Sequence, residues 1–63
     1  MKIKTNAIER RAAAMQLNYK QIAAAAGVTE KTLQSARNGA TIRTDTAGRI
    51  AAALGVNVEE LIK

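Results

Sequence analysis

The chain has 63 residues, with ten Lys or Arg against five Asp or Glu, which gives a net charge of +5. A chain of this length forms one domain, residues 1–63, too small for a large enzyme cleft, so we expect a binding module and no enzyme. It has no Cys and no His, which excludes disulfides, zinc fingers and His-dependent catalysis. The positive charge favours a polyanionic partner, nucleic acid before a membrane surface.

Alanine dominates the apolar residues, at fourteen, and the chain has no Phe, Trp or Pro. Ala has the lowest cost in a helix and little bulk, so helices can cross closely, whereas residues that favour sheets are sparse. Four glycines interrupt any long heptad pattern, which argues against a coiled coil. The composition therefore predicts an all-α fold with a tight core.

The first predicted helix covers about residues 6–16, with Thr5 or Asn6 as its N-cap. Its apolar face recurs at helical spacing, at Ile8, Ala12 and Met15. A second, short helix follows. Asn18 and Gln21 have the spacing of a capping box for its start, and Gly27 ends it.

Thr29 is a suitable N-cap for a third helix over residues 30–37, which Asn38 and Gly39 end. Residues 40–44 have no clear period and are predicted to form a loop. A fourth helix is predicted over about residues 45–54, because apolar residues return there at helical spacing.

Asn57 and Glu60 repeat the capping-box spacing and predict a fifth helix, which we expect to fray at the chain end.

Residues 19–38 have the pattern of two short helices that meet at a steep angle, a helix-turn-helix. Ala23 is small where the helices cross, Gly27 permits the turn, and Val28 with Leu33 fills the corner. A plain helical hairpin would account for each position separately. The caps, the corner and the basic charge together favour the helix-turn-helix.

Several motifs lie at matching intervals along the chain. They are Leu17 to Ala23, Gly27-Val28-Thr29, Leu33, Asn38-Gly39 and Ile50 to Val56. With these motifs the chain resembles the lambda-repressor-like, or Cro/C1-type (XRE), helix-turn-helix family from about Ile8 to Ile62. The resemblance implies five helices, DNA held by the second and third, and commonly a homodimer on a pseudo-palindromic site. Such members include phage repressors, antitoxins and small bacterial regulators.

Two positions depart from the family pattern. Relatives often carry an acidic residue just before the Asn-Gly, paired with a basic residue on the first helix, whereas here Arg37 stands there and Ala12 faces it in the alignment. We therefore expect the usual buried ion pair to be absent. Tyr19 stands where many relatives have Gln or Ser, which puts that phosphate contact in doubt.

The third helix carries the candidates for contacts with bases. With Leu33 inward, steps of about 100° per residue place Lys31 and Ser35 on the opposite side, flanked by Gln34 and Asn38. Recognition helices insert their N-terminal part into the major groove. The predicted base-reading residues are Glu30, Lys31, Gln34 and Ser35, of which the resemblance selects all but Gln34. A merely solvated polar face would show the same pattern.

Phosphate contacts are expected from polar groups at helix N-termini and from cations around the groove. The predicted residues are Asn18, Tyr19, Thr29, Thr32, Asn38 and Arg43. Residues 1–43 hold eight Lys or Arg against two Glu, a balance of +6, while residues 44–63 hold two cations against three carboxylates, or −1. The DNA side is therefore predicted in the N-terminal two-thirds.

The C-terminal apolar residues offer a possible dimer interface, which the resemblance also suggests. The candidates are Val58, Leu61 and Ile62, of which Ile62 is the best and the other two suit the core. We expect the homodimer to be weak.

These observations predict sequence-specific binding to double-stranded DNA by a bacterial or phage transcriptional regulator, in the first place a repressor. The alternative is a protein-interaction module or antitoxin-type regulator that keeps the fold without independent DNA readout. The carboxylates are scattered and no nucleophile has a base beside it, so we expect no catalysis, cofactor, metal or small-molecule substrate. The longest apolar stretch, residues 22–28, is far below the roughly 18 to 20 residues that cross a bilayer, so we expect a cytoplasmic, nucleoid-associated protein without membrane contact.

Overall fold

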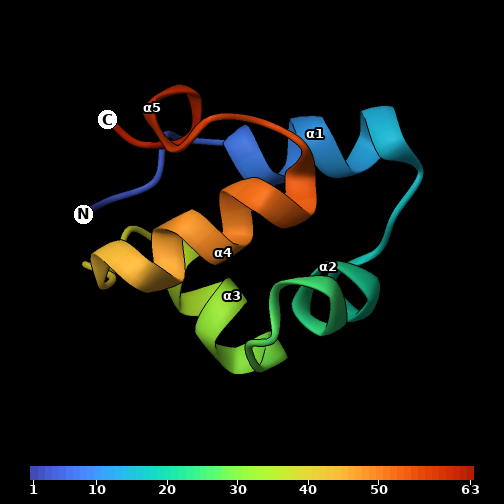
Figure 1. Cartoon of the computed structure of the whole chain (residues 1–63), viewed down its shortest axis with the longest axis horizontal. Helices are drawn as coiled ribbons and strands as arrows, with labels where there is room; N and C mark the ends of the chain where they lie inside the picture. The colour runs from blue at the N-terminus through green and yellow to red at the C-terminus, as the bar shows by residue number, and fades with distance from the viewer.

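Five helices follow one another in the computed structural model, which describes residues 1–63 (Figure 1). They are α1 (Ala7–Met15), α2 (Tyr19–Ala26), α3 (Glu30–Arg37), α4 (Thr44–Leu54) and α5 (Val58–Leu61). The all-α prediction is confirmed, and each predicted helix lies within one or two residues of its observed position. None of the five is long and apolar enough to cross a membrane.

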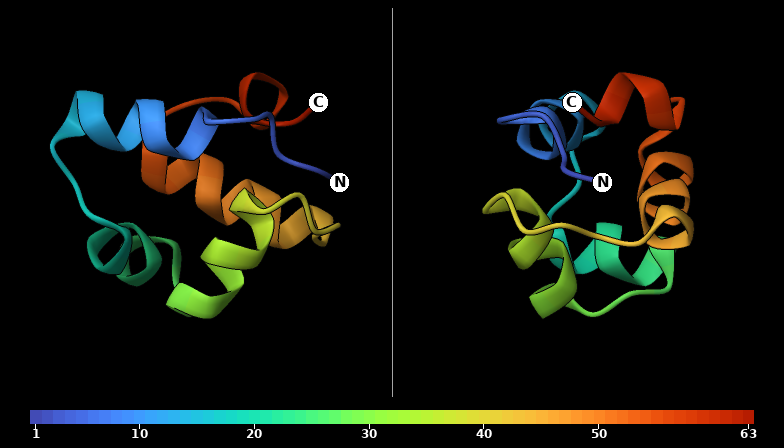
Figure 2. Two further views of the ribbon diagram at one scale, coloured as in Figure 1. Left: turned by 180° about the vertical axis from the view of Figure 1, so that it is seen from behind. Right: turned by 90° about the vertical axis from the view of Figure 1, so that its left-hand side faces the viewer.

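Helix α4 lies at the centre of the fold. In Figures 1 and 2 it runs between α1 and α5 on one side and α2 and α3 on the other. It packs against α1, α2 and α5. Its buried residues are Ala47, Ile50, Ala51 and Leu54. A helix that contributes to every part of the core needs this mixture of small and branched side chains, because its neighbours approach it from several directions.

The core is entirely apolar. All 13 buried residues are hydrophobic, and six of them are Ala. No buried side chain carries a polar atom without a hydrogen-bond partner, so the core has no uncompensated desolvation cost. The largest fully buried side chains are Ile8, Ile22, Leu33, Ile50, Leu54 and Leu61. Aliphatic side chains packed between alanines thus fill a core that has no buried aromatic residue.

The helix-turn-helix is formed by α2 and α3 and has the predicted caps. Asn18 Oδ1 accepts from the backbone nitrogen of Gln21 at 2.8 Å, and Asn18 donates its own backbone N–H to Gln21 Oε1 at 2.9 Å, which completes the capping box. Gly27 ends α2 with φ +73°, a left-handed conformation that glycine adopts without strain. Thr29 Oγ1 then accepts from Thr32 N at 3.1 Å and begins α3.

Helix α1 differs from its prediction at both ends. Asn6 occupies the N-cap position, as predicted, but has φ +64°, and its side chain makes no cap hydrogen bond. Met15 is 36% exposed and is not part of the apolar face. The helix ends at Met15, and the following turn brings Leu17 against the core in its place.

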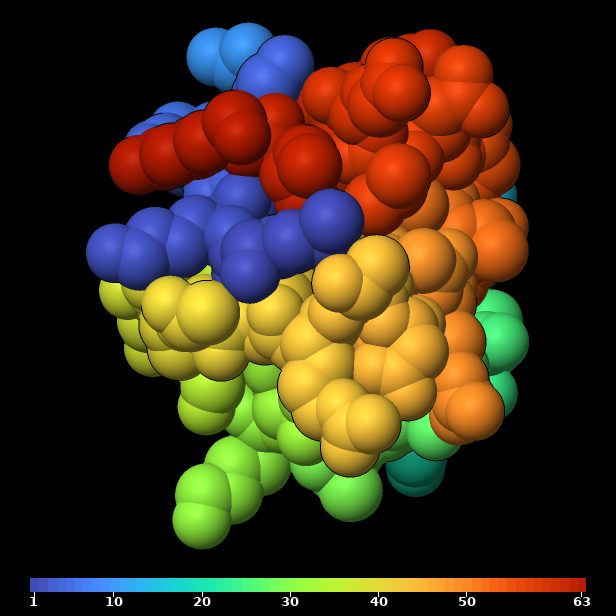
Figure 3. Space-filling view, turned by 60° about the vertical axis from the view of Figure 1, so that its left-hand side comes forward, coloured from blue at the N-terminus to red at the C-terminus, as the bar shows by residue number.

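Helix α5 also differs from its prediction. Asn57 makes no cap hydrogen bond to the helix backbone, and its side chain only reaches Glu60 Oε1, at 3.5 Å, so no capping box forms. The expected fraying is wrong as well, because Ile62 forms an antiparallel bridge with Ile3. The segment after α5 is thereby fixed to the start of the chain, and Figure 3 shows the two ends of the chain side by side.

The packing of α2 gives a test of the core. Ala23 is 3% exposed, and leucine there adds bulk to a site without room for it. We expect Ala23→Leu to lower the free energy of unfolding by about 1 to 3 kcal/mol in urea denaturation. Ala24→Leu, on the exposed side of the same helix, is the control and should change it by less than about 0.5 kcal/mol. Equal stability of the two variants would contradict close packing at Ala23.

Candidate nucleic-acid interface

The exposed side of α3 is polar. Leu33 and Ala36 point into the core with no exposed surface. All four predicted base-reading residues are exposed, and they form what we call the recognition face: Glu30, Lys31, Gln34 and Ser35. This face carries one cation, one carboxylate, one amide and one hydroxyl, so it offers both donors and acceptors.

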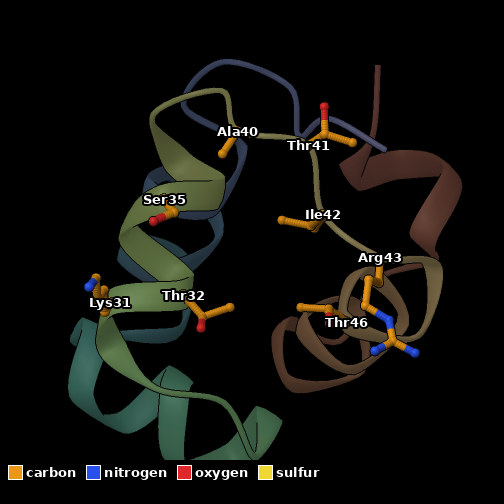
Figure 4. A pocket seen from close by; sticks show the side chains of 8 residues that line it. All are labelled: Lys31, Thr32, Ser35, Ala40, Thr41, Ile42, Arg43 and Thr46. Carbon is orange, nitrogen blue, oxygen red and sulfur yellow. The ribbon is translucent and has the colours of Figure 1, made fainter.

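A groove of about 350 Å³ runs beside the recognition face, between α3 and the start of α4 (Figure 4). Its lining residues are Lys31, Thr32, Ser35, Ala40, Thr41, Ile42, Arg43 and Thr46. Figure 4 shows Thr32 and Ile42 pointing across the groove, while Lys31 and Arg43 project away from it on opposite sides. The groove therefore has hydroxyl and methyl groups inside and a cation at each flank.

The predicted phosphate contacts lie at the edges of this surface. Asn18 and Thr29 are exposed at the N-termini of α2 and α3, where their oxygens also cap the helices. Thr32 is half-buried, and its hydroxyl lies 2.9 Å from that of Thr29. Asn38 is exposed at the C-cap of α3. These groups lie at the N-terminus of α2 and toward both ends of α3, so they flank the recognition face.

Arg43 stands at the N-cap of α4 and is highly exposed, at 85% of its side chain. Its Nε lies 3.4 Å from Asp45 Oδ1, a solvent-exposed pair of little energetic value. The N-cap side chain of α4 makes no cap hydrogen bond, but Asp45 Oδ1 accepts from Thr46 N at 3.0 Å, so only the N–H groups of Thr44 and Asp45 remain open to an anion. The N–H groups at this helix start and the nearby Thr46 were not among the predicted phosphate-binding groups. The polar run from Thr44 to Thr46 was the available signal.

Tyr19, Glu9 and Arg37 form a cluster that joins the first three helices. The Tyr19 hydroxyl donates a hydrogen bond to Glu9 Oε1. Arg37 Nε lies 3.2 Å from the same oxygen, and the Arg37 guanidinium carbon lies 5.7 Å from the centre of the Tyr19 ring. The proton of the Tyr19 hydroxyl is thus already engaged within the protein.

The predicted absence of a buried ion pair between the first and third helices is confirmed, because no charged residue is buried. A partly exposed pair joins the two helices in its place, with the carboxylate of Glu9 on α1 and the cation of Arg37 at the end of α3. Glu9 lies one turn before Ala12, which was expected to face Arg37 but is 6% exposed and belongs to the core.

The same cluster perturbs the tyrosine. Partial burial, the hydrogen bond to Glu9 and the nearby Glu9 charge raise the pKa of Tyr19 to about 12, against the opposing effect of Arg37. All three causes disfavour the phenolate. The neutral hydroxyl is the form that can donate to Glu9, so the cluster requires a protonated Tyr19.

The candidate dimer residues are not equivalent in the structure. Leu61 is 1% exposed and packs in the core, the use for which the sequence suits it, so its side chain is not available to a second subunit. Val58 and Ile62 are half-buried and keep some exposed surface.

Asp and Glu residues are dispersed over the structure, and no three of them gather into a group that could hold a metal ion.

Tyr19 is the only aromatic residue, so its ionisation can be followed by ultraviolet absorbance without interference. We expect Glu9→Gln to lower the Tyr19 pKa toward 10.0, its ordinary value, because the nearby negative charge is removed. Arg37→Ala should raise it, because a favourable cation is lost. Arg49→Ala removes the same charge from α4 and is the control.

A pKa that is higher in the folded state also makes stability depend on pH. The stabilisation is fully present below the unfolded value near 10 and is lost as the pH rises toward 12. We therefore expect the stability advantage of the wild type over Tyr19→Phe to shrink across this interval in chemical denaturation. An advantage that stays constant from pH 9 to 12 would refute the coupling of Tyr19 to Glu9.

Comparison with known families agrees with this geometry. Residues 7–63 match the Cro/C1-type HTH DNA-binding domain, which covers nearly the whole chain. Comparisons with curated proteins and with solved structures give no match. The order of the five helices and the capped turn between α2 and α3 fit this family. The chain therefore belongs to the Cro/C1-type helix-turn-helix family of DNA-binding domains that regulate transcription.

Proposed function

We propose that the chain binds double-stranded DNA sequence-specifically, with α3 in the major groove. The observation that carries this proposal is the recognition face: four exposed side chains with hydrogen-bonding groups on the second helix of a helix-turn-helix. The family membership supports it, because an outward α3 is the element that such domains direct at base edges.

The side chains of the recognition face match different bases. Lys31 can donate to O6 and N7 of guanine, and Gln34 can form a paired contact with N6 and N7 of adenine. Glu30 can accept from N4 of cytosine, and Ser35 can serve as donor or acceptor. A site read by this face would therefore contain more than one kind of base pair.

Phosphates would flank α3 on both sides. Asn18 and Thr29 stand at helix N-termini that favour anions, and Arg43 with the start of α4 offers a cation and the free N–H groups of Thr44 and Asp45 on the other side of the groove. Thr32 and Asn38 lie between them. We leave Tyr19 out of this set, because its hydroxyl donates to Glu9.

We further propose that the chain acts as a repressor. A domain that occupies its site in the major groove blocks competing proteins by occupancy alone, and this needs no surface beyond the one described. The proposed location is the cytoplasm, on the nucleoid, where duplex DNA is available to such a regulator.

The size of one recognition helix argues for a homodimer. A single α3 contacts about four or five base pairs, too few to select one site among millions of competitors. Val58 and Ile62 are the candidates for the seam, and their remaining exposed surface is far below the roughly 1,200 Å² of a stable interface. The dimer would therefore be weak in solution and complete on DNA.

Binding to selected duplexes tests the division between base and phosphate contacts. After selection from a random duplex pool, Lys31→Ala and Ser35→Ala should each change the preference at one or two positions by about 1 to 3 kcal/mol. Arg43→Ala should weaken all sequences alike and reduce the salt slope by about 1. Affinity for the wild type should fall steeply with salt, because about three to five phosphate contacts release counterions.

Arg10→Ala is the control, because it removes one charge from α1, which lies across α4 from α3 (Figure 1). Uniform weakening by all four variants would contradict base reading by α3. A wild type that binds single strands as well as duplex would favour the protein-interaction alternative.

Sedimentation and footprinting test the dimer. At micromolar concentration the free protein should sediment mainly as a monomer, and footprints should show paired half-sites about ten or eleven base pairs apart. The two α3 helices would then lie about 34 Å apart, one helical turn of DNA. Full affinity for an unpaired half-site would rule out the dimer.

A further inference from the structure

The first four residues lie between two segments that are distant in sequence. On one side, Lys4 N donates to the carbonyl of Leu61 at 2.8 Å, and Lys63 N donates to the carbonyl of Lys2 at 3.0 Å. On the other side, Ile42 N donates to the carbonyl of Met1 at 2.7 Å, and the Met1 nitrogen donates to the carbonyl of Ile42 at 2.9 Å. We call residues 1–4 the N-terminal strap.

The strap is anchored in the core as well as by its backbone. Ile3 is 4% exposed and belongs to the main hydrophobic cluster, and it bridges Ile62. Figure 3 shows the strap between the loop after α3 and the C-terminal segment. The strap therefore has a hydrophobic anchor and two hydrogen-bonded edges.

The loop that the strap holds is the one beside the recognition face. Residues 40–43 line the groove, and Arg43 immediately follows Ile42. Between Gly39 and α4 this loop makes few other backbone hydrogen bonds: Ala40 N donates to Ser35, and the Arg43 carbonyl accepts from Ala47. Both of these bonds belong to the ends of helices. The two bonds with Met1 are the backbone hydrogen bonds that hold the middle of the loop, where the Ile42 side chain also packs against the core.

We propose that the N-terminal strap positions the loop over residues 40–43, and with it Arg43, for contact with a DNA phosphate. This inference rests on the proposed DNA binding. A loop held in one conformation loses less conformational freedom on binding, so a phosphate contact made from it is stronger. Strap residues thus contribute to DNA affinity without touching DNA, and Lys4 and Lys63 act as positioning residues through their backbone N–H groups.

Proline substitutions test the strap, because proline has no N–H to donate. The variant Lys4→Pro with Lys63→Pro removes both hydrogen bonds between the strap and the C-terminal segment. The matched control, Lys2→Pro with Lys63→Ala, also removes two lysine charges, one from the strap and one from Lys63, but keeps both bonds, because Lys2 N donates no hydrogen bond. Ile62 has φ −91° and ψ 157°, an extended conformation that suits the residue before a proline.

The first measurement is amide hydrogen exchange in the free protein. In the double-proline variant we expect the Ile42 amide to exchange at least about tenfold faster than in the control, while the amides of α2 keep their protection. Unchanged exchange at Ile42 would overturn the proposal. Loss of protection throughout would indicate global unfolding and would also overturn it, since the strap would then stabilise the whole fold and not the loop.

The second measurement is affinity for a duplex recovered from a random pool and carrying a single half-site, so that dimer formation does not enter. The double-proline variant should bind about tenfold more weakly than the control, as for the loss of one charge-assisted phosphate contact. Its preference among sequences should be unchanged. In an Arg43→Ala background, the same prolines should not weaken DNA binding further, because the phosphate contact that the strap positions is already absent.

An additive loss in the Arg43→Ala background would show that the strap acts elsewhere and would overturn the proposal. A wild type that binds no duplex would overturn the proposed function instead, together with the role of the strap in DNA binding. The exchange at Ile42 would then still decide whether the strap holds the loop, so the two failures are distinguishable.

Discussion

The fold depends on how closely α1, α2 and α5 can approach α4. With no aromatic residue in the core, stability has to come from many short contacts between aliphatic side chains, and these require small separations. Ala47 and Ala51 on α4, with Ala23 on α2 and Ala12 on α1, provide the small surfaces that permit them. The abundance of alanine is therefore a packing requirement as much as a helix preference.

The position of α3 is fixed by contacts at its inner side and at both of its ends. Leu33 and Ala36 anchor its inner side, Thr29 caps its start, and Arg37 ties its end to Glu9 on α1. The recognition face thus projects from a helix whose rotation and ends are determined. Preorganisation of this kind lowers the entropic cost of placing side chains against base edges.

The fold also determines which cations have partners within the protein. The exposed cations near α3 remain available to a polyanion, whereas Arg37 is paired with Glu9, and Arg11 Nε donates to the Leu54 carbonyl at the end of α4 at 2.7 Å. These two arginines belong to the internal support of the fold. The positive charge available at the interface is therefore smaller than the net charge of +5 suggests.

The sequence by itself determined the features that depend on neighbouring residues. The five helices, the capping box at Asn18 and Gln21, the Thr29 cap and the turn at Gly27 all follow from contacts within four residues, and they were predicted correctly. Only the tertiary structure decided the partner of Arg37, the exposure of Met15 and the pairing of Ile3 with Ile62. Each of these depends on which elements meet in space across tens of residues, and neither helical period nor cap spacing carries that information.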